Sequence, residues 1–477
     1  MSSFDAHVIV VGGGLTGLTA AFQLQQSGLS VLVLEAAARA GGVIGTDRCA
    51  LADGEALCER GPNSAMDTAP QIDLLLDALG IRDQRVDAEP AAQRRYLLRG
   101  GRLVAVPSGP LSFLTTPLFS AGAKLRLLRE PLVARRAHDG AAEESVASFV
   151  RRRLGPEMLD YAVEPLVGGI YAGDPDRLSL PALFAPLAQM EDRYGSLLRG
   201  AVAGVRERRK QTTTTGRTPK PRARSFNFRG GMQTLTDALA HRLAQLQCQT
   251  CVVAIMPQTD GCFALRVEHQ GEGRTLRSQA LLLAVPAHVA AGLVAPLGPA
   301  GAAASGALAA IDAPPLATVT ALYRRADIAH PLDGFGVLAP RVEAPPLLGT
   351  LFASSMFAQR APAGTAVLTS FVGGRRDPDA AREDDAALTA RVTDANTRWL
   401  GAGTPVQVRI TRWPHAIPQY DLGHPQRLAA VATLEAQVPG LTLAGSWRDG
   451  VSIADCIVAG ARHADAIRAA LPIPAVG

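Results

Sequence analysis

The sequence predicts a mixed α/β fold, and three stretches of the chain carry that prediction. Residues 7–35 form the pattern strand, glycine turn, helix, strand. A strand-and-helix pattern returns over residues 225–285, and residues 440–470 close the pattern with a strand, a glycine-containing turn and a long helix. Strands that alternate with helices indicate a largely parallel sheet, whereas the short alternating strands of residues 315–413 indicate an antiparallel one. We therefore expect one α/β domain made of separated pieces of chain, with an antiparallel-sheet domain and a helical domain inserted into it.

The glycine turn near the N-terminus has the spacing G-x-G-x-x-G and joins an apolar strand to a helix. Its first glycine permits a tight turn, its second lets the backbone approach a pyrophosphate, and its third allows close helix–strand packing. Glu35 lies 23 positions after Gly12 and can accept hydrogen bonds from an adenosine ribose. This Rossmann-type context predicts dinucleotide binding. The predicted contacts in this turn are Gly12, Gly13, Gly14, Leu15, Thr16 and Gly17.

A second glycine-rich turn, Arg39-Ala40-Gly41-Gly42, comes just after Glu35. It can wrap the far side of the pyrophosphate, and Arg39 can offset the phosphate charge. The alternative is a plain loop with a solvated arginine. The R-x-G-G spacing after the acid resembles a large class of flavoproteins that includes amine oxidases, phytoene desaturases and protoporphyrinogen oxidases. That resemblance implies FAD held along the domain, with Arg39, Gly42 and Val43 among its contacts.

Composition excludes some classes of function. The chain has 477 residues, 47% of them hydrophobic and 19% charged, which suits two or three globular domains. Its formal net charge of +5 is weak and dispersed, so we expect no nucleic-acid partner. The first strand begins at residue 7 and no apolar span of about 20 residues is unbroken. We expect a cytoplasmic chain, either soluble or peripherally attached to the inner face of a membrane.

The cysteines are too sparse for a disulfide framework, with six in the whole chain. Cys248-x-x-Cys251 has the spacing of a redox or zinc motif, but no second pair or histidine cluster lies near it. We interpret both as buried, reduced thiols and expect no metal.

The domain boundaries predicted from these patterns alternate along the chain. They are an FAD-binding domain of residues 1–90, 226–300 and 425–477, a substrate-binding sheet of 91–105 and 301–424, a helical, membrane-associating candidate of 106–204, and a basic linker of 205–225.

Residues 206–224 are rich in threonine and contain eight basic residues and one acidic residue. The segment has no apolar face, so the pattern predicts a mobile surface loop rather than a packed element. The alternative is a role in attraction to anionic lipid headgroups.

Four further motifs occur in the order expected for one family. They are Gly61-Pro62-Asn63-Ser64, Gly168-Gly169-Ile170-Tyr171-Ala172-Gly173, Trp413-Pro414-His415-Ala416-Ile417-Pro418-Gln419-Tyr420 and Ala444-Gly445-Ser446-Trp447 with Asp455-Cys456. They resemble the protoporphyrinogen and coproporphyrinogen oxidases of the flavin amine oxidase-like superfamily. The resemblance runs from about residue 5 to 465, and the insert at 206–224 is its principal departure.

The resemblance implies where FAD would lie. A helix that begins near Val451 would aim its N–H groups at the flavin N1/O2 edge and stabilise the reduced, anionic ring. Trp413 is expected near the isoalloxazine, and Val252 near the adenosine through its backbone, although each read locally would be a core residue. The other implied contacts are Gly61, Pro62, Asn63, Ser64, Gly445, Ser452 and Ile453.

The resemblance also implies a substrate site. Arg95 matches the arginine that pairs with a substrate propionate, which suits a planar guanidinium, while its neighbour Arg94 is expected to be solvated. Gly169 matches a glycine whose backbone faces pyrrole N–H groups. The apolar walls around the tetrapyrrole would be Leu338, Leu351 and Phe371.

The activity that the resemblance implies is oxidation of protoporphyrinogen IX to protoporphyrin IX in three two-electron steps, with O2 reduced to hydrogen peroxide. No catalytic side chain is assigned, because the noncovalent flavin performs the redox step. Coproporphyrinogen III is the nearest alternative substrate. An amine oxidase and a non-catalytic binding protein on the same scaffold rank lower. Peripheral membrane contact and a homodimer both stay open.

Overall fold

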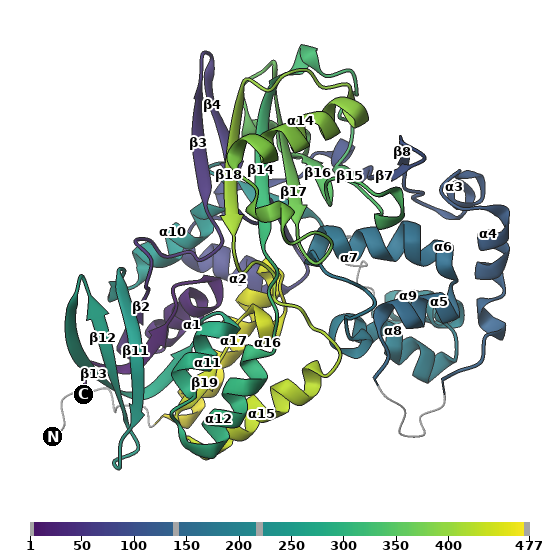
Figure 1. Cartoon of the computed structure of the whole chain (residues 1–477). Helices are drawn as coiled ribbons and strands as arrows, with labels where there is room; N and C mark the ends of the chain where they lie inside the picture. The colour runs from purple at the N-terminus through teal and green to yellow at the C-terminus, as the bar shows by residue number, and fades with distance from the viewer. Residues whose placement is uncertain (1–3, 137–142, 216–222, 472–477) are drawn as a thin grey trace.

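The computed structural model describes residues 4–136, 143–215 and 223–471 (Figure 1). A first sheet with flanking helices, a second sheet and a group of helices to one side make up the molecule. The predicted fold class is confirmed: a mixed α/β chain with a discontinuous Rossmann-type domain, an antiparallel-sheet domain and a helical domain.

The first sheet runs through parallel pairs in the order β10-β2-β1-β13. The end of β13 pairs in parallel with β19, and its earlier residues pair antiparallel with β12, which in turn pairs with β11. The bounds are β1 Ala6–Val11, β2 Val31–Leu34, β10 Leu246–Gln247, β11 Thr250–Pro257, β12 Phe263–His269, β13 Glu272–Leu283 and β19 Leu441–Leu443. One sheet therefore collects strands from three distant stretches of sequence.

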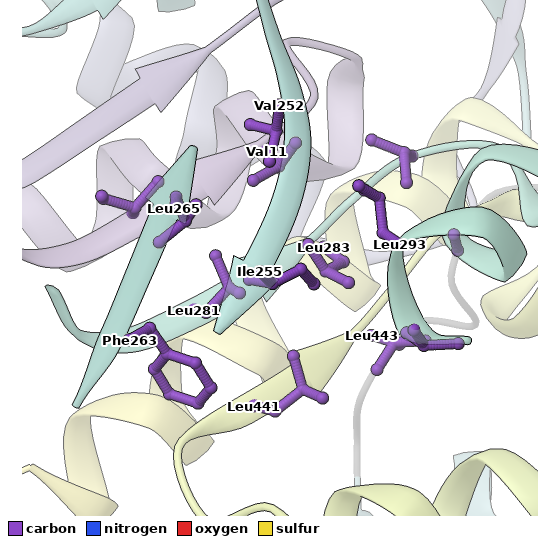
Figure 2. Close-up of a cluster of buried hydrophobic side chains, with 14 of the residues drawn as sticks. Val11, Val252, Ile255, Phe263, Leu265, Leu281, Leu283, Leu293, Leu441 and Leu443 are labelled. Carbon is purple, nitrogen blue, oxygen red and sulfur yellow. The ribbon is translucent and has the colours of Figure 1, made fainter. Parts of the chain in front are cut away.

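Both faces of β1 are buried, and alternate residues serve different cores. Ile9 and Val11 join the apolar cluster of Figure 2, which is completed by helices on one side of the sheet. Val8 and Val10 join a second cluster on the opposite side. The first cluster takes residues from α11 Ala287–Val294, α12 Gly298–Ala309 and α15 His424–Gln437, and the second from α1 Leu15–Gln26 and α17 Ile453–Ala470.

The second sheet has the order β18-β14-β17-β16-β15-β7-β8. One of its faces is covered by α14 Asp385–Leu400, through a cluster that includes Val319, Val372, Leu388 and Val392. The strand bounds are β7 Tyr96–Arg99, β8 Arg102–Ala105, β14 Leu316–Arg324, β15 Gly336–Leu338, β16 Gly349–Phe352, β17 Thr365–Gly373 and β18 Gln407–Trp413. We call the opposite side the inner face.

The helical region lies beside the second sheet, and its outer edge, with α3 and α4, is on the side of the molecule away from the first sheet (Figure 1). Its helices are α3 Pro110–Thr115, α4 Ala121–Leu128, α5 Val146–Arg153, α6 Pro156–Met158, α7 Glu164–Tyr171, α8 Leu180–Tyr194 and α9 Leu197–Thr215. Two smaller sheets and four further α-helices lie outside these parts, and short 3-10 helices and one π-helix, Leu159–Val163, join the elements. The two sheets and four α-helices are β3 Thr46–Leu51 with β4 Gly54–Glu59, β5 Ala65–Met66 with β9 Ser225–Phe228 and β6 Arg85–Asp87, and α2 Pro70–Leu79, α10 Gln233–Arg242, α13 Ala353–Met356 and α16 Ser446–Asp449.

Two predictions from the sequence need correction. The basic segment is not wholly a linker, because α9 continues to Thr215, so residues 206–215 are helical and 216–222 lie outside the described residues. Arg, Glu, Lys and Gln favour helix, and they extend a helix that has already begun at Leu197. Cys248 and Cys251 are free thiols but are not buried: Cys251 is exposed because the next residue of β11, Val252, takes the inward position.

Within the described ranges, no helix combines the length and apolar character needed to cross a membrane. The same ranges contain no cluster of three or more His, Cys, Asp or Glu side chains suited to holding a metal ion.

Candidate functional site

The three glycines of the G-x-G-x-x-G turn have different surroundings. A Cβ at Gly12, where φ is +105°, would stand 2.4 Å from the carbonyl oxygen of Ala284, and a Cβ at Gly17 would stand 2.1 Å from the carbonyl oxygen of Gly12. Both positions are therefore closed to any side chain. A Cβ at Gly14 would meet no atom within 4 Å, so the space in front of Gly14 is open. This is the arrangement that a pyrophosphate against the turn requires.

Glu35 is held in place by the turn that it follows. Its carboxylate accepts the N–H groups of Gly13 at 2.7 Å and Ala37 at 2.8 Å. At the start of α1, the N–H groups of Leu15 and Thr16 make no hydrogen bond within the described part of the chain. Free N–H groups at a helix N-terminus attract phosphate, so this end of α1 remains available to an anion.

The second glycine turn is organised by Arg39. Its guanidinium donates to the carbonyl oxygens of Ala40 at 3.0 Å and Ile44 at 2.8 Å, so the side chain is not simply solvated. A Cβ at Gly42 would stand 3.3 Å from the Cα of Gly14, which places the two glycine turns against each other. Val43 is 46% exposed, an apolar side chain left uncovered beside the open space.

The loop Gly61-Pro62-Asn63-Ser64 follows β4 and is anchored by a buried carboxylate. Glu59 accepts hydrogen bonds from the Thr46 hydroxyl at 2.6 Å and the Met232 N–H at 2.8 Å, and pairs with Arg360 at 2.8 Å. Asn63 is buried, and its side-chain oxygen has no partner within the described part of the chain. An unpartnered buried oxygen is costly, so this loop is suited to a ligand that donates a hydrogen bond.

A second free helix N-terminus lies at α17. Ser452 and Asp455 cap the helix reciprocally, whereas the N–H groups of Val451 and Ile453 make no hydrogen bond among the described residues. Gly445 has φ +146°, and a Cβ there would stand 2.9 Å from the indole nitrogen of Trp447. The motif from Gly445 to Ile453 thus presents unpartnered donors at the start of an 18-residue helix.

The predicted substrate residues of the second sheet share its inner face. Leu338 lies opposite Gly349, which lies opposite Phe371, and Leu351 follows Gly349 by two positions. Residues opposite each other, or two apart on a strand, point to the same side. The register brings Leu338, Leu351 and Phe371 onto one surface, and each is only partly buried.

The same register adds both flanks of this surface. In the parallel pair of β15 and β7, Leu97 lies beside Leu338, so Arg95, two positions earlier, belongs to the same side. Arg95 is exposed, with its guanidinium 5.3 Å from the ring centre of Phe335. At the other flank Trp413 lies opposite Leu316, and its indole N–H donates to the carbonyl oxygen of Arg60 at 3.1 Å. Trp413 therefore joins the inner face to the start of the Gly61–Ser64 loop.

For three residues discussed in the sequence analysis, the structure shows contacts with neighbouring protein groups. A Cβ at Gly169 would stand 2.3 Å from Cδ2 of Leu338, so Gly169 leaves room for that side chain. Val252 packs its side chain into the core of Figure 2, which leaves its backbone as the part free to face a ligand. Arg94, expected to be solvated, forms an ion pair with Asp333.

Sequence reasoning missed several residues that organise the site. Glu59 and Arg360 are 301 positions apart, and nothing in the local sequence pairs them. Tyr420, which donates to the carbonyl oxygen of Ser446 at 2.5 Å, was visible only as the last residue of a motif. Its position one residue before Asp421 and four before His424 carried no signal of its own.

The two glycine turns, the free N-termini of α1 and α17 and the orphan oxygen of Asn63 define a dinucleotide-binding flavoprotein fold, and the residues present fit FAD. The family model described as flavin containing amine oxidoreductase matches residues 15–468, and the chain belongs to that family. It is an FAD-dependent oxidoreductase.

Curated relatives cover almost the whole chain. The mitochondrial protoporphyrinogen oxidase of Nicotiana tabacum is 32% identical over 97% of this chain and 94% of its own length. The coproporphyrinogen III oxidase of Propionibacterium freudenreichii subsp. freudenreichii is 34% identical over 98% of this chain and 92% of its own length.

Solved structures show the same fold. A crystal structure from Exiguobacterium sp., provisionally named as a protoporphyrinogen oxidase, superposes with a TM-score of 0.80 at 24% identity, covering 97% of this chain and 99% of that one. Cyclohexylamine oxidase from Brevibacterium oxydans superposes with a TM-score of 0.69 at 18% identity, covering 97% of this chain and 98% of that one.

Proposed function

We propose that this flavoenzyme oxidises a porphyrinogen, with protoporphyrinogen IX as the substrate. The observation that carries the proposal is the inner face of the second sheet. It sets a cationic side chain, Arg95, at one flank of an apolar surface and Trp413 at the other, next to the predicted flavin loop. A porphyrinogen is an apolar macrocycle with carboxylates at one edge, so a surface of this composition suits it. Relatives that bear both porphyrinogen oxidase names support the same class of substrate.

The protein's own part in the reaction is to bind and orient. Bound FAD supplies a two-electron acceptor for the hydride removed from a methylene bridge between pyrroles. The walls formed by Leu338, Leu351 and Phe371 exclude water and orient the macrocycle, while Arg95 anchors a propionate by a charge-assisted hydrogen bond. The free N–H groups at Val451 and Ile453 would hold the pyrimidine side of a bound flavin and stabilise the negative charge that develops there on reduction.

Anaerobic mixing tests this function directly. Protein loaded with FAD is mixed with protoporphyrinogen IX or coproporphyrinogen III, and flavin bleaching is followed by its visible absorbance. We expect bleaching by both and faster bleaching by protoporphyrinogen. Faster bleaching by coproporphyrinogen, which has four propionates instead of two, would make coproporphyrinogen III the preferred substrate. No bleaching by either would overturn the proposal. Readmitted O2 should restore the colour and release hydrogen peroxide, which tests O2 as the acceptor.

Arg95 and its neighbour form a matched pair for locating the propionate. Arg95→Ala should raise KM more than it lowers kcat, with a loss of about 1.5–3 kcal/mol in kcat/KM, because the contact exists before and during the reaction. Arg94→Ala removes a cation that already pairs with Asp333 and should leave kcat/KM nearly unchanged. Equal losses in the two variants would show a general effect of charge and remove Arg95 from the site.

We propose noncovalent attachment of FAD. Cys456 is the cysteine of the C-terminal motif, but burial raises the pKa of its thiol to about 11, so it stays protonated and a poor nucleophile at neutral pH. Acid precipitation should release all the yellow colour into the supernatant, and colour retained in the pellet would show a covalent bond.

We also propose that the helical region rests on an anionic membrane surface, the inner face of a cytoplasmic membrane. Its outer edge carries five exposed leucines, the leucine surface: Leu111, Leu114, Leu125, Leu128 and Leu132. Their exposed fractions run from 50% for Leu125 to 80% for Leu132. Lys124, Arg126 and Arg129 lie among them on the same helix or directly after it, so apolar and cationic groups share one edge. That combination fits the boundary between acyl chains and anionic headgroups.

Co-sedimentation with vesicles tests the leucine surface. Vesicles of phosphatidylcholine with phosphatidylserine should bind the protein, and Leu128→Asp with Leu132→Asp should abolish binding. Leu74→Asp, at an equally exposed leucine of α2, is the matched control and should bind normally. Deletion of 216–222 should not matter; loss of binding there would move the contact to the basic segment. A different outcome would be that the wild type forms a homodimer but does not bind vesicles, and that the double variant is monomeric. The leucine surface would then be the interface with a second copy of the chain.

A further inference from the structure

Residues 419–424, which we call the strap, pass between the helical region and the C-terminal flavin motif. On one side the strap is bonded to the helical region: the N–H of Ser179 donates to the carbonyl oxygen of Tyr420 at 2.8 Å, and the N–H of Leu422 donates to that of Arg177 at 2.8 Å. The side-chain amide of Gln419 donates to the carbonyl oxygen of Tyr171 at 2.8 Å. The strap is therefore fixed by at least three helical-region residues.

On its other side the strap reaches the flavin motif through the side chain of Tyr420. The Tyr420 hydroxyl donates to the carbonyl oxygen of Ser446 at 2.5 Å and accepts the N–H of Gly450 at 2.9 Å. Tyr420 is 7% exposed, so these bonds are shielded from water. A single phenol oxygen thus ties together the first and last residues of the turn formed by α16 and Gly450.

The position of this turn decides where the free N–H groups of α17 point. Gly450 has φ +109°, and because glycine has no Cβ its backbone can adopt other conformations unless contacts hold it. Val451 and Ile453 follow directly. Loss of the phenol oxygen would leave the Ser446 carbonyl and the Gly450 N–H without their partner. The turn would then either rearrange to find other partners or fluctuate.

A second ring holds Tyr420 in place. The imidazole of His424 stacks on the Tyr420 ring with centroids 4.4 Å apart and planes inclined by 11°. His424 is 2% exposed, and neither ring nitrogen has a hydrogen-bond partner within the described part of the chain. Its ring therefore acts on Tyr420 through packing rather than through a hydrogen bond, and an apolar ring of similar shape could replace it.

We propose that Tyr420 is a positioning residue for the flavin, which fixes the Gly450 turn so that the N-terminus of α17 meets the pyrimidine edge of the ring. The proposal rests on the flavin contact assigned above to Val451 and Ile453. Tyr420 itself touches neither the reacting atoms nor the substrate. Its bonds to the turn and its backbone bond to Ser179 also connect the flavin motif to the helical region.

The test compares two buried tyrosines. Tyr420→Phe removes the phenol oxygen from the strap, and Tyr323→Phe removes one of similar burial, whose hydroxyl accepts from Asn396 at 3.3 Å on the face covered by α14. Hydrogen exchange, the FAD dissociation constant and the flavin midpoint potential are measured on both. His424→Phe and His424→Ala form a second pair, in which only the phenylalanine keeps a stacked ring.

Tyr420→Phe should speed hydrogen exchange in residues 446–453 about tenfold and weaken FAD binding about tenfold. The reduced flavin should lose more than the oxidised one, and a further tenfold for the reduced form corresponds to about 30 mV toward more negative potential. Tyr323→Phe should leave all three measurements at wild-type values. His424→Ala should follow Tyr420→Phe, and His424→Phe should restore the wild-type potential.

Equal exchange, FAD affinity and potential in Tyr420→Phe and Tyr323→Phe would overturn the proposal. Faster exchange with an unchanged potential would overturn it as well, because the turn would then move without affecting the flavin. Failure of the proposed substrate gives a different signature: neither porphyrinogen would bleach the wild-type flavin, while the potential shift of Tyr420→Phe would remain.

Discussion

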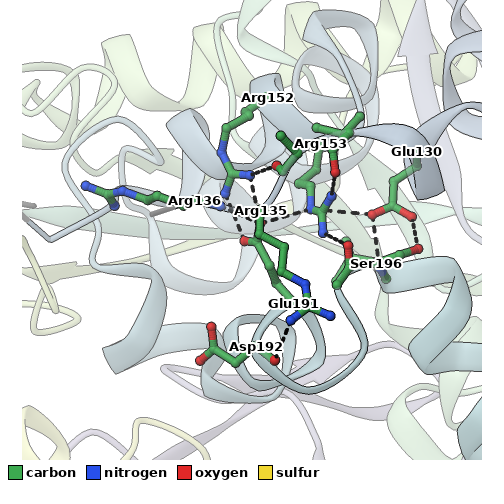
Figure 3. Close-up of polar contacts among 12 residues, drawn as sticks. Glu130, Arg135, Arg136, Arg152, Arg153, Glu191, Asp192 and Ser196 are labelled. Carbon is green, nitrogen blue, oxygen red and sulfur yellow. Dashed lines mark hydrogen bonds and ion pairs between the residues drawn. The ribbon is translucent and has the colours of Figure 1, made fainter. Parts of the chain in front are cut away.

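Leu281 in the first sheet and Arg153 in the helical region are equally inaccessible to water, but their neighbours differ in kind. Leu281 is surrounded by apolar side chains from both the sheet and its helices (Figure 2). Arg153 is 0% exposed and lies 3.4 Å from each of two carboxylates, Glu130 and Glu191 (Figure 3). Burial of Leu281 is favourable because it removes apolar surface from water. Burial of Arg153 is tolerated because its charge is compensated by two carboxylates.

The ionic cluster lies among helices that an apolar cluster also joins, with residues from α5, α7, α8 and α9. Arg152 pairs with Glu144 at 2.9 Å and with Glu191 at 2.8 Å, and Arg153 donates to the carbonyl oxygen of Val133 at 2.9 Å. Glu130 accepts the Ser196 hydroxyl and the N–H of Leu197. These bonds connect α5 and α8 to the residues that follow α4 and to the start of α9. The comparison teaches that the cofactor part is stabilised by apolar packing, whereas the helical part combines an apolar cluster with buried charges that need their partners.

The largest expected effect comes from breaking the ionic cluster at its centre. Arg153→Met keeps an unbranched, buried side chain but leaves Glu130 and Glu191 without their shared cation. Removal of one partner of a buried pair costs about 3–5 kcal/mol. We expect the loss to be local: hydrogen exchange should rise in α5, α8 and the start of α9 while FAD stays bound. Global unfolding together with loss of FAD would show that the two regions do not fold as separately stable parts.

The matching change in the first sheet is Leu281→Ala. Truncation of a fully buried leucine removes apolar contact and leaves a cavity, at a cost of about 2–5 kcal/mol in the free energy of unfolding. Because β13 lies at the centre of the sheet and borders the Gly12 turn, FAD should dissociate more readily, as fluorescence of released flavin would show. Leu74→Ala, 67% exposed on α2, should change the free energy of unfolding by less than about 0.5 kcal/mol. Retention of FAD by Leu281→Ala with faster exchange only in the helical region would reverse the comparison.

How far the sequence predicts each region follows from the same difference. Residues 7–35 and 280–285 show their apolar runs directly, so the strands, the glycine turn and the role of Glu35 could be predicted. Burial of β1 on both faces follows from a run without polar interruptions. The partners of Arg153 are 23 and 38 positions away, and a run of three arginines at 151–153 reads as a solvated face. Only the fold shows which of the three is buried.

The candidate site divides in the same way. The glycines and the Gly61–Ser64 loop could be predicted from sequence motifs, because backbone geometry there requires particular residues at fixed spacing. The inner face of the second sheet required the register of six strands, which no local pattern fixes, and only the resemblance pointed to Leu338, Leu351 and Phe371. Tyr420 and Glu59 act through partners far away in sequence, so they emerged only from contacts. The helical continuation of α9 was missed because a composition typical of a linker is also compatible with helix.

Acidification should affect the two regions over different pH ranges. Burial lowers the pKa of His424 to about 4, with Arg427 adding to the effect and Glu143 opposing it, whereas an unfolded histidine titrates near 6.5. The unfolded state therefore binds more protons between these values, and the stability of the part around α15 should fall as pH drops from 6.5 to 4, on the order of 3 kcal/mol at most. His424→Phe should flatten this range in urea unfolding monitored by flavin release.

The ionic cluster responds at lower pH. Burial alone would raise the pKa of Glu191, but the hydrogen bonds and charge of Arg152 outweigh it and lower that pKa. A carboxyl whose folded pKa is depressed contributes stability above its unfolded pKa, and that stability is lost as pH falls through the folded value. Hydrogen exchange in α5 and α8 should therefore stay slow until pH falls below about 4. Faster exchange there at pH 5 than around α15 would contradict this order.

The smallest expected effect tests whether burial or the distance between the charges decides how much an ion pair contributes to stability. Arg48 and Glu55 pair at 3.0 Å on the β3–β4 hairpin, closer than Arg153 to either of its carboxylates, but their side chains are 61% and 54% exposed. Water already solvates both charges and salt screens them, so Arg48→Ala should cost less than about 1 kcal/mol, and that cost should vanish in high salt. Urea unfolding at low and high salt measures both effects, and Arg153→Met should show little dependence on salt because its surroundings exclude ions. If Arg48→Ala were as damaging as Arg153→Met, the distance between the charges would decide their contribution, and the deep burial of Arg153 would not explain the stability of the helical region.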